Sequence, residues 1–276
     1  MLRREGVAVT ILILALMLVG GPVRGQETSS APPASTGVPA PTASTEPAPS
    51  PGRQVSWKLL APNVLRDQKP IWLFPVRVAQ GQHWKPTLAV VLGTAAMVAL
   101  DPHDTPYFRR TDSFNGFNKV LSGRNTALGT AIVPLSVYAV GLVRHDSYAQ
   151  QTVLFAGQAV VDAEILTTVL KDITGRLRPV EIPPHGDYSH TWFKSQGPWF
   201  SGRGSFPSGH TIAAFSVATV FAERYKKHRW VPWVAYAMAG LVGFSRVSLQ
   251  SHFPSEVFAG ATLGFAISRY VVLRHP

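Results

Sequence analysis

Residues 204–222 read GSFPSGHTIAAFSVATVFA, and this stretch decides the fold. Small and apolar residues dominate it, and no proline interrupts it after Pro207, so it predicts a helix. Ser208 is a residue type favoured at a helix N-cap. The exposed N–H groups of the first turn, together with Gly209 and His210, therefore indicate an anion site at the start of this helix.

Five further apolar stretches have a similar composition and predict five more helices. They are roughly Pro86–Leu100, Asn125–Val143, Ser147–Leu170, Trp230–Phe244 and Val257–Leu273. We therefore expect an all-α fold, a six-helix bundle.

The bundle can lie in a membrane or in solution. A spanning helix needs about 20 mostly apolar residues, and only 125–143 and 204–222 approach that length without a charge. We favour a membrane-embedded form with five spans or re-entrant pieces, while a soluble exported bundle stays open. The basic segment ERYKKHR at 223–229 is typical of a cytoplasmic helix end.

The N-terminal part predicts export. Arg3 and Arg4 precede an uncharged apolar run, and small residues follow it, so residues 1–25 read as a signal peptide cut after Gly25. An uncleaved anchor helix is the alternative. Residues 26–55 are rich in Pro, Ser, Thr and Ala and predict a disordered tether. Residues 56–276 then form the functional domain, with its active site on the outer side of the cytoplasmic membrane.

Charge and cysteine content narrow the function classes. Lys and Arg outnumber Asp and Glu by 26 to 15, so a phosphate ester or an acidic lipid is a suitable partner. The basic residues are scattered and no nucleic-acid motif is present, which indicates no nucleic-acid partner. The chain has no cysteine, so disulfides, thiolate metal sites and a cysteine nucleophile are excluded. The sequence leaves the oligomeric state open.

Two more segments carry reactive side chains. Lys171 and Arg178 enter a loop closed by Pro179, and two cations so close can clamp a phosphate. The segment SRVSLQSHFPSE at 245–256 places Glu256 one helical turn after His252. A carboxylate there can accept the Nδ1 proton of the imidazole and leave Nε2 free as a nucleophile.

In order and spacing, the three segments resemble the signature of the phosphatidic acid phosphatase type 2 (PAP2)/vanadium haloperoxidase superfamily, K-x6-R-P, P-S-G-H and S-R-x5-H-x3-D. The match runs over residues 171–256, and the helical pattern extends it to most of 84–273. The residues Gly204-Ser205-Phe206 also resemble the approach to this motif in exported bacterial acid phosphatases. The chain departs from the signature at Glu256, where the family usually has Asp, which puts the rate in doubt more than the reaction.

The resemblance implies a role for each matching residue. His252 attacks phosphorus and forms a phosphohistidine, Glu256 orients it, and His210 is the general acid and base. The phosphate would be held by Lys171, Arg178, Ser208, Gly209 and Arg246. No metal and no cofactor is implied.

The activity implied is hydrolysis of a phosphomonoester or diphosphate, with a lipid phosphate or polyprenyl diphosphate as the favoured substrate. A vanadate-dependent haloperoxidase, a soluble exported non-specific acid phosphatase and a non-catalytic binding module stay open as alternatives. Specificity is expected in the loops 101–124 and 180–203.

Other polar residues are weaker candidates for a functional role. Two acidic and histidine clusters could bind a metal, although their spacing matches no established site; they are His185, Asp187 and His190, and Asp101, His103 and Asp104. Asp162 and Glu164 would be buried and functional if their helix lies in lipid.

Overall fold

The computed structural model describes residues 53–195 and 197–274. The predicted signal peptide, and all but the last three residues of the predicted tether, lie outside the described residues. The arrangement below concerns the unit that begins at Val55.

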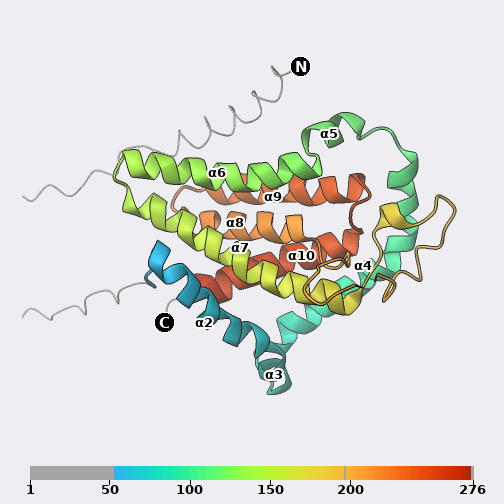
Figure 1. The fold of residues 1–276 in the computed structure, drawn as a ribbon, viewed down its shortest axis with the longest axis horizontal. Helices are drawn as coiled ribbons and strands as arrows, with labels where there is room; N and C mark the ends of the chain where they lie inside the picture. Colours follow the sequence, from blue (N-terminus) through green and yellow to red (C-terminus); the bar gives the residue numbers. More distant parts are fainter. Residues whose placement is uncertain (1–52, 196, 275–276) are drawn as a thin grey trace, which may run out of the picture. The chain divides into compact units, whose positions relative to one another are not determined.

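The described residues form helices and no strand, which confirms the expected all-α fold (Figure 1). All six predicted helices are present, and three shorter helices, α2, α3 and α5, join them. The helices are α2 (Leu60–Trp72), α3 (Phe74–Ala79), α4 (Trp84–Arg110), α5 (Asn115–Val120), α6 (Gly123–Val143), α7 (Ser147–Thr174), α8 (Gly209–Arg224), α9 (Trp230–Ser248) and α10 (Pro254–Ile267), with the short turns η1 (Trp57–Leu59), η2 (Pro179–Glu181) and η3 (Ser268–Val272).

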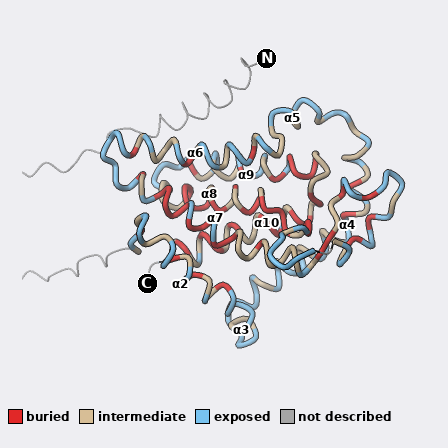
Figure 2. The backbone as a smooth tube through the Cα atoms, in the orientation of Figure 1, coloured by how far each residue is buried: buried red, intermediate tan, exposed pale blue. Residues whose placement is uncertain are grey.

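Helix α8 is the centre of the bundle, and α7, α9 and α10 pack around it. Its residues Ile212 and Val220 are fully buried, and Figure 2 shows buried positions concentrated on α7, α8 and α10. Helix α10 lies so close to α8 that a Cβ added at Gly264 would be 2.5 Å from the carbonyl oxygen of Ile212. The absence of a side chain at Gly264 therefore permits this approach. The quoted segment 204–222 is thus the central helix, although the helix begins at Gly209 and not at Gly204.

Chain direction brings the three motifs to one end of the bundle. Helices α6, α8 and α10 begin at this end, and α7 and α9 finish there (Figure 1). Helix α7 ends at Gly175, whose φ of 47° is left-handed. A glycine adopts this conformation without a Cβ penalty. After this turn, residues 176–178 run across the end of the bundle toward η2.

Two helices of the described residues are long and apolar enough to cross a membrane, one within Gly123–Val143 and one within Ser147–Glu181. A third span is possible if the bent pair Trp57–Ala79 and Trp84–Arg110, with an angle of 97°, counts as one. Helices of this kind are typical of an integral membrane protein. Residues 204–222 approach a spanning length in the sequence, but helix α8 has only 16 residues and is not one of these two candidate spans.

Candidate active site

The candidate site lies where the motifs meet. Each side chain sits within a turn of a helix end or on an adjoining connection: Lys171 in the last turn of α7, Arg178 before η2, His210 in the first turn of α8, Arg246 in the last turn of α9, and His252 and Glu256 around the start of α10. Helix ends expose unpaired N–H and C=O groups, so polar side chains gather there at little cost in helix stability.

His252 is held by its Nδ1 atom. Nδ1 lies 2.7 Å from Oε2 of Glu256, and Ser205 Oγ lies 3.2 Å from the same ring nitrogen. Ser205 also donates to Oε2 of Glu256 at 2.5 Å. A carboxylate at Nδ1 sets the tautomer with the proton there. Nε2 has no hydrogen bond within the described residues, so it is the ring nitrogen available for nucleophilic attack.

Burial governs the charge of His252, which lies between α9 and α10, outside both candidate spans. Burial lowers the pKa of its imidazole, and Glu256 opposes that shift through its hydrogen bond and its charge. Arg178 and Lys171 lower the pKa further. The ring is therefore neutral at neutral pH, which is the protonation state that a nucleophile requires.

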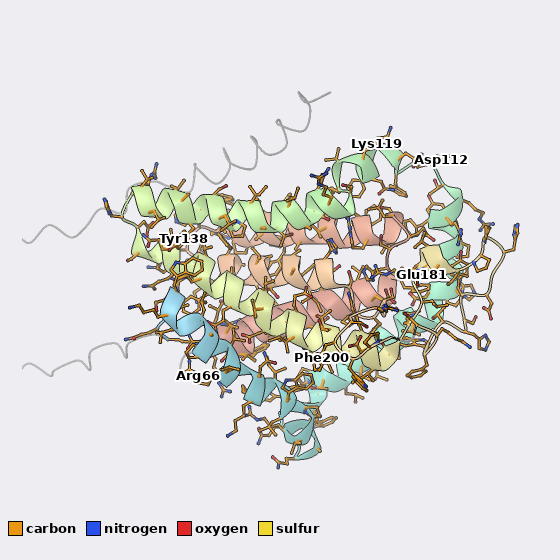
Figure 3. All side chains as sticks on the ribbon, in the orientation of Figure 1. Arg66, Asp112, Lys119, Tyr138, Glu181 and Phe200 are labelled. Carbon is orange, nitrogen blue, oxygen red and sulfur yellow. The ribbon has the colours of Figure 1, made fainter. Side chains whose placement is uncertain are left out.

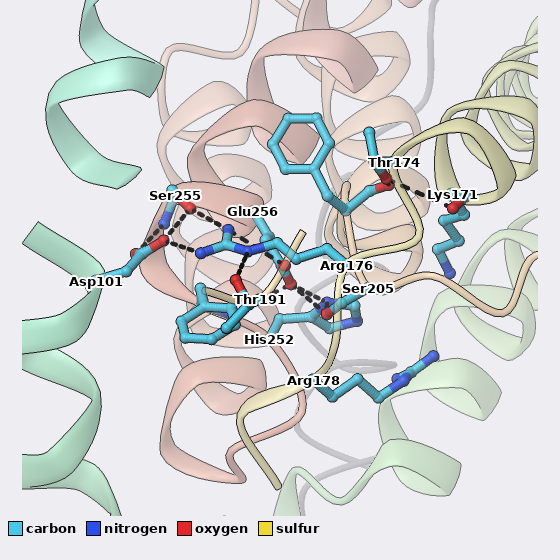
Figure 4. A network of polar contacts seen from close by, with 12 residues as sticks. Asp101, Lys171, Thr174, Arg176, Arg178, Thr191, Ser205, His252, Ser255 and Glu256 are labelled. Atoms are coloured by element: carbon cyan, nitrogen blue, oxygen red, sulfur yellow. Dashed lines mark hydrogen bonds and ion pairs between the residues drawn. The ribbon is translucent and has the colours of Figure 1, made fainter. Parts of the chain in front are cut away.

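Two cations of the site, Lys171 and Arg178, lie near His252. In Figure 4, Lys171 and Arg178 lie beside the His252 ring, on the side away from Arg176. Gly209 is close to the same place, since a Cβ on it would lie 3.6 Å from Nζ of Lys171. Without a side chain, its backbone can approach an anion closely.

Arg246 and His210 each contact a backbone carbonyl oxygen near the start of α6. Arg246 Nη2 donates to the carbonyl oxygen of Leu121 at 2.6 Å, and His210 Nε2 lies 3.1 Å from that of Gly123. Burial, with the nearby charge of Arg246, lowers the pKa of His210 to about 4. A bound phosphate dianion would oppose this shift because it favours the protonated ring.

The predicted position of Ser208 at the helix N-cap, which is that of α8, is confirmed, but its side chain does not act as a cap for any backbone N–H there. Its hydroxyl instead lies 2.8 Å from Oγ1 of Thr211, and its N–H donates to the carbonyl oxygen of Glu256. These contacts tie the start of α8 to the start of α10.

Sequence reasoning missed Arg176 and the role of Ser205. Arg176 is only 1% exposed and contacts Glu256 and Asp101. The single local signal was its position between the two motif cations Lys171 and Arg178. Its partner Asp101 lies 75 positions away in the chain, so no spacing rule could have found the pair.

The weaker candidates lie in different surroundings, and two of them are close to the site. Asp101 lies inside helix α4, not in a loop, and its carboxylate is engaged by Arg176. Asp187 and His190 form an exposed pair at 2.6 Å. Within residues 53–195 and 197–274, no three His, Cys, Asp or Glu side chains form a group that could hold a metal ion. Glu164 lies beside the site, 3.4 Å from where a Cβ of Gly209 would be, and buried Asp162 accepts from Gln68.

Comparisons with known proteins agree with the motif recognition. The family model of the PAP2 superfamily matches residues 152–276. A lipid A 1-phosphatase from Rhizobium etli is 32% identical over 43% of this chain and 45% of its own length. A lipid A 4'-phosphatase from Porphyromonas gingivalis is 27% identical over 39% of this chain and 44% of its own. The chain thus spans less than half the length of either relative.

A solved structure also aligns with the chain. It is a transmembrane PAP2 type phosphatidylglycerolphosphate phosphatase from Bacillus subtilis, with 24% identity, a TM-score of 0.40, and coverage of 75% of this chain and 94% of that one.

Proposed function

Because residues 152–276 match the family model of the PAP2 superfamily, we propose that the protein is a metal-independent phosphatase that works through a phosphohistidine on His252. The observation that carries the proposal is the His252–Glu256 pair at 2.7 Å, with the opposite ring nitrogen beside Lys171 and Arg178.

The reaction has two steps. Nε2 of His252 attacks phosphorus, a P–N bond forms, and the P–O bond to the leaving group breaks while His210 supplies its proton. His210 then accepts a proton from water, which attacks phosphorus and breaks the P–N bond. Glu256 stabilises the positive imidazole ring in between.

Cationic side chains supply the charge stabilisation. Lys171, Arg178 and Arg246, with the Gly209 amide, would bind the phosphoryl oxygens, whose charge spreads in the transition state. Arg246 can do this and keep its present partners, because its hydrogen bonds to Ser245 and Leu121 use only Nε and Nη2. Among the described residues Nη1 has no hydrogen-bond partner, so it can donate to a phosphate oxygen.

A phosphorylated lipid or polyprenyl diphosphate is the substrate class that the surroundings favour. An almost wholly apolar cavity of about 490 Å³ lies between α4 and α10, and its lining includes Phe206 and Ala259. Phe206 follows Ser205, and Ala259 lies about one turn after Glu256, so the cavity adjoins the site. It would accept a hydrocarbon chain. Two of the relatives are named for a lipid phosphate.

The test is phosphate release by the purified protein in detergent, with excess EDTA present. We expect hydrolysis of lipid phosphates with a kcat/KM at least about tenfold above that of p-nitrophenyl phosphate, since the hydrocarbon chain adds binding energy. His252→Ala is the control and should release nothing.

Other outcomes identify the alternatives. A preference for the soluble ester would favour a non-specific acid phosphatase, and bromide oxidation after vanadate loading would favour a haloperoxidase. Dependence on a divalent ion would overturn the mechanism. No release from any ester would leave a binding module.

A further inference from the structure

We propose that Arg176 is a positioning residue: clamped by Asp101 and two aromatic rings, its guanidinium fixes the Glu256 carboxylate that orients His252. The proposal rests on the proposed function, and it adds a residue at one of the variable positions of the superfamily signature. It concerns a contact behind the nucleophile, on the side away from Lys171 and Arg178 (Figure 4).

The two oxygens of Glu256 have separate partners. Oε2 is taken by His252, Ser205 and the backbone N–H of Phe253, at 2.7, 2.5 and 3.3 Å. Within the described residues, Oε1 has no hydrogen-bond partner, and Nη1 of Arg176 lies 3.4 Å from it. Glu256 is fully buried, and a buried carboxylate requires a compensating cation. Arg176 supplies that cation to the oxygen that His252 leaves unused.

Arg176 is itself held on every side. Its Nη2 pairs with Oδ2 of Asp101 at 2.7 Å, its Nε donates to Thr191 at 3.0 Å, and its Nη1 donates to Ser255 at 2.9 Å. Asp101 also accepts from the hydroxyl and the backbone N–H of Ser255. The guanidinium plane is therefore fixed by three parts of the chain, which are α4, the loop at Thr191 and α10.

Two aromatic rings complete the clamp. The guanidinium carbon lies 4.4 Å from the ring centre of Trp192 and 3.9 Å from that of Phe253. Cation–π contacts of this kind stabilise a desolvated guanidinium, and a lysine cannot reproduce their geometry. Phe253 directly follows His252, so the clamp and the nucleophile share one stretch of chain.

The charges explain why both members of the Arg176–Asp101 pair are needed. Arg176 alone could draw Glu256 away from His252, because a full charge attracts more strongly than a neutral imidazole. Asp101 is closer to the guanidinium, 2.7 Å against 3.4 Å, and takes the stronger pairing. Glu256 then keeps enough negative charge to stabilise the imidazolium of the phosphoenzyme.

The test is a double-mutant cycle that spares the buried charge balance. Arg176→Met combined with Asp101→Asn removes both charges together. Arg176→Lys keeps the positive charge but loses the planar guanidinium, which donates to several partners at once. We expect either to slow phosphoenzyme formation about 10- to 100-fold, while KM and the inhibition constant of orthophosphate change less than about threefold. In a Glu256→Gln background, the same changes should cost less than about twofold, because residues acting through one another are not additive.

The matched control is Arg224→Met at the opposite end of α8. Arg224 also stacks on an aromatic ring, 3.9 Å from the ring centre of Tyr148, and donates to Thr152 at 2.6 Å. The Arg224→Met variant should have a lower melting temperature, while its rate of phosphoenzyme formation per folded molecule stays unchanged. Equal losses from the Arg176 changes in both Glu256 backgrounds, or losses confined to KM, would overturn the positioning role.

A second readout does not depend on turnover. Imidazole ¹⁵N NMR of His252, assigned with His252→Ala, should show the tautomer with a proton on Nδ1 in the parent chain and a mixture in Arg176→Met/Asp101→Asn. An unchanged spectrum would overturn the proposal even if hydrolysis is slowed. A changed spectrum in a chain that hydrolyses nothing would refute the phosphatase function and keep the positioning role.

Discussion

The two histidines of the site have different hydrogen-bond partners, and we expect their substitutions to reduce activity in different ways. His252 is oriented by a carboxylate at 2.7 Å, whereas His210 meets a neutral carbonyl oxygen at 3.1 Å. His252→Ala should abolish turnover and the acid-labile phosphoenzyme with every substrate. His210→Ala should lose about 10²–10⁴-fold with alkyl phosphates and much less with p-nitrophenyl phosphate, whose leaving group needs no proton.

Acid quenching and rates on both esters give the measurement. Glu256→Ala should fall between the two histidine variants, and Glu256→Asp should retain most of the rate, since the superfamily usually has Asp at that position. A phosphoenzyme that survives in His252→Ala, or equal losses on both esters in His210→Ala, would contradict the assignment of roles.

The burial of His252 predicts the acid limb of the pH profile. The nucleophile must be neutral, and burial lowers the pKa of its imidazole below the ordinary value of about 6.5. The rate of phosphoenzyme formation by free enzyme should therefore fall only below that pH. Glu256→Gln removes the group that raises this pKa, so the limb should move to lower pH as the rate drops. A limb that moves upward would show that Glu256 is not coupled to His252.

At the scale of single residues, sequence spacing predicted the residues that we propose to bind phosphate, and it could not predict those behind them. The signature fixes His252 and Glu256 four positions apart, which is a local relation. Arg176 and Asp101 meet only because α4 passes beside the start of α10. No local pattern encodes that contact.

Among the elements, the close packing of α8 on α10 sets the position of the site. Gly264→Ala would place a Cβ 2.5 Å from a backbone oxygen of α8, so the helices must separate. Overpacking of this kind costs about 1–3 kcal/mol, and we expect a lower melting temperature together with a lower kcat. Gly240→Ala in α9 is the control because no atom lies within 4 Å of its added Cβ, and helix propensity should make it neutral or stabilising. Equal melting temperatures would contradict the packing argument.

Helix α2 shows why the element prediction was incomplete. Its Asn63 and Asp67 are buried against Gln158 of α7, which donates to Asp67 at 2.6 Å. Just before α2, Trp57 donates at 2.6 Å to Tyr138, which is labelled in Figure 3. The helix thus makes its contacts with polar side chains as well as with Ile71, and a search for apolar runs passes over it. The other six helices were predicted correctly because each contains a long run of apolar residues, which the sequence shows directly.

For the whole molecule, the orientation across the membrane is the prediction that joins sequence and structure. The catalytic end of the bundle is opposite the α8–α9 connection, which carries Lys226, Lys227 and Arg229. Basic residues at helix ends favour the cytoplasmic side, so the catalytic end should face outward. The absence of cysteine allows a direct measurement with single introduced thiols.

We therefore expect His185→Cys, exposed beside η2 at the catalytic end, to react with a membrane-impermeant maleimide in intact cells, and Lys226→Cys to react only after the membrane is opened. Reaction at both sites in intact cells would mean that the bundle is exported without crossing the membrane. The reverse pattern would place the catalytic end inside and refute the outward orientation. These outcomes are distinct because a bundle whose helices span the bilayer has its two ends on opposite sides. Phosphate release by each thiol variant is the control that the labelled chains are folded, since neither residue lies among those that touch His252 or Glu256.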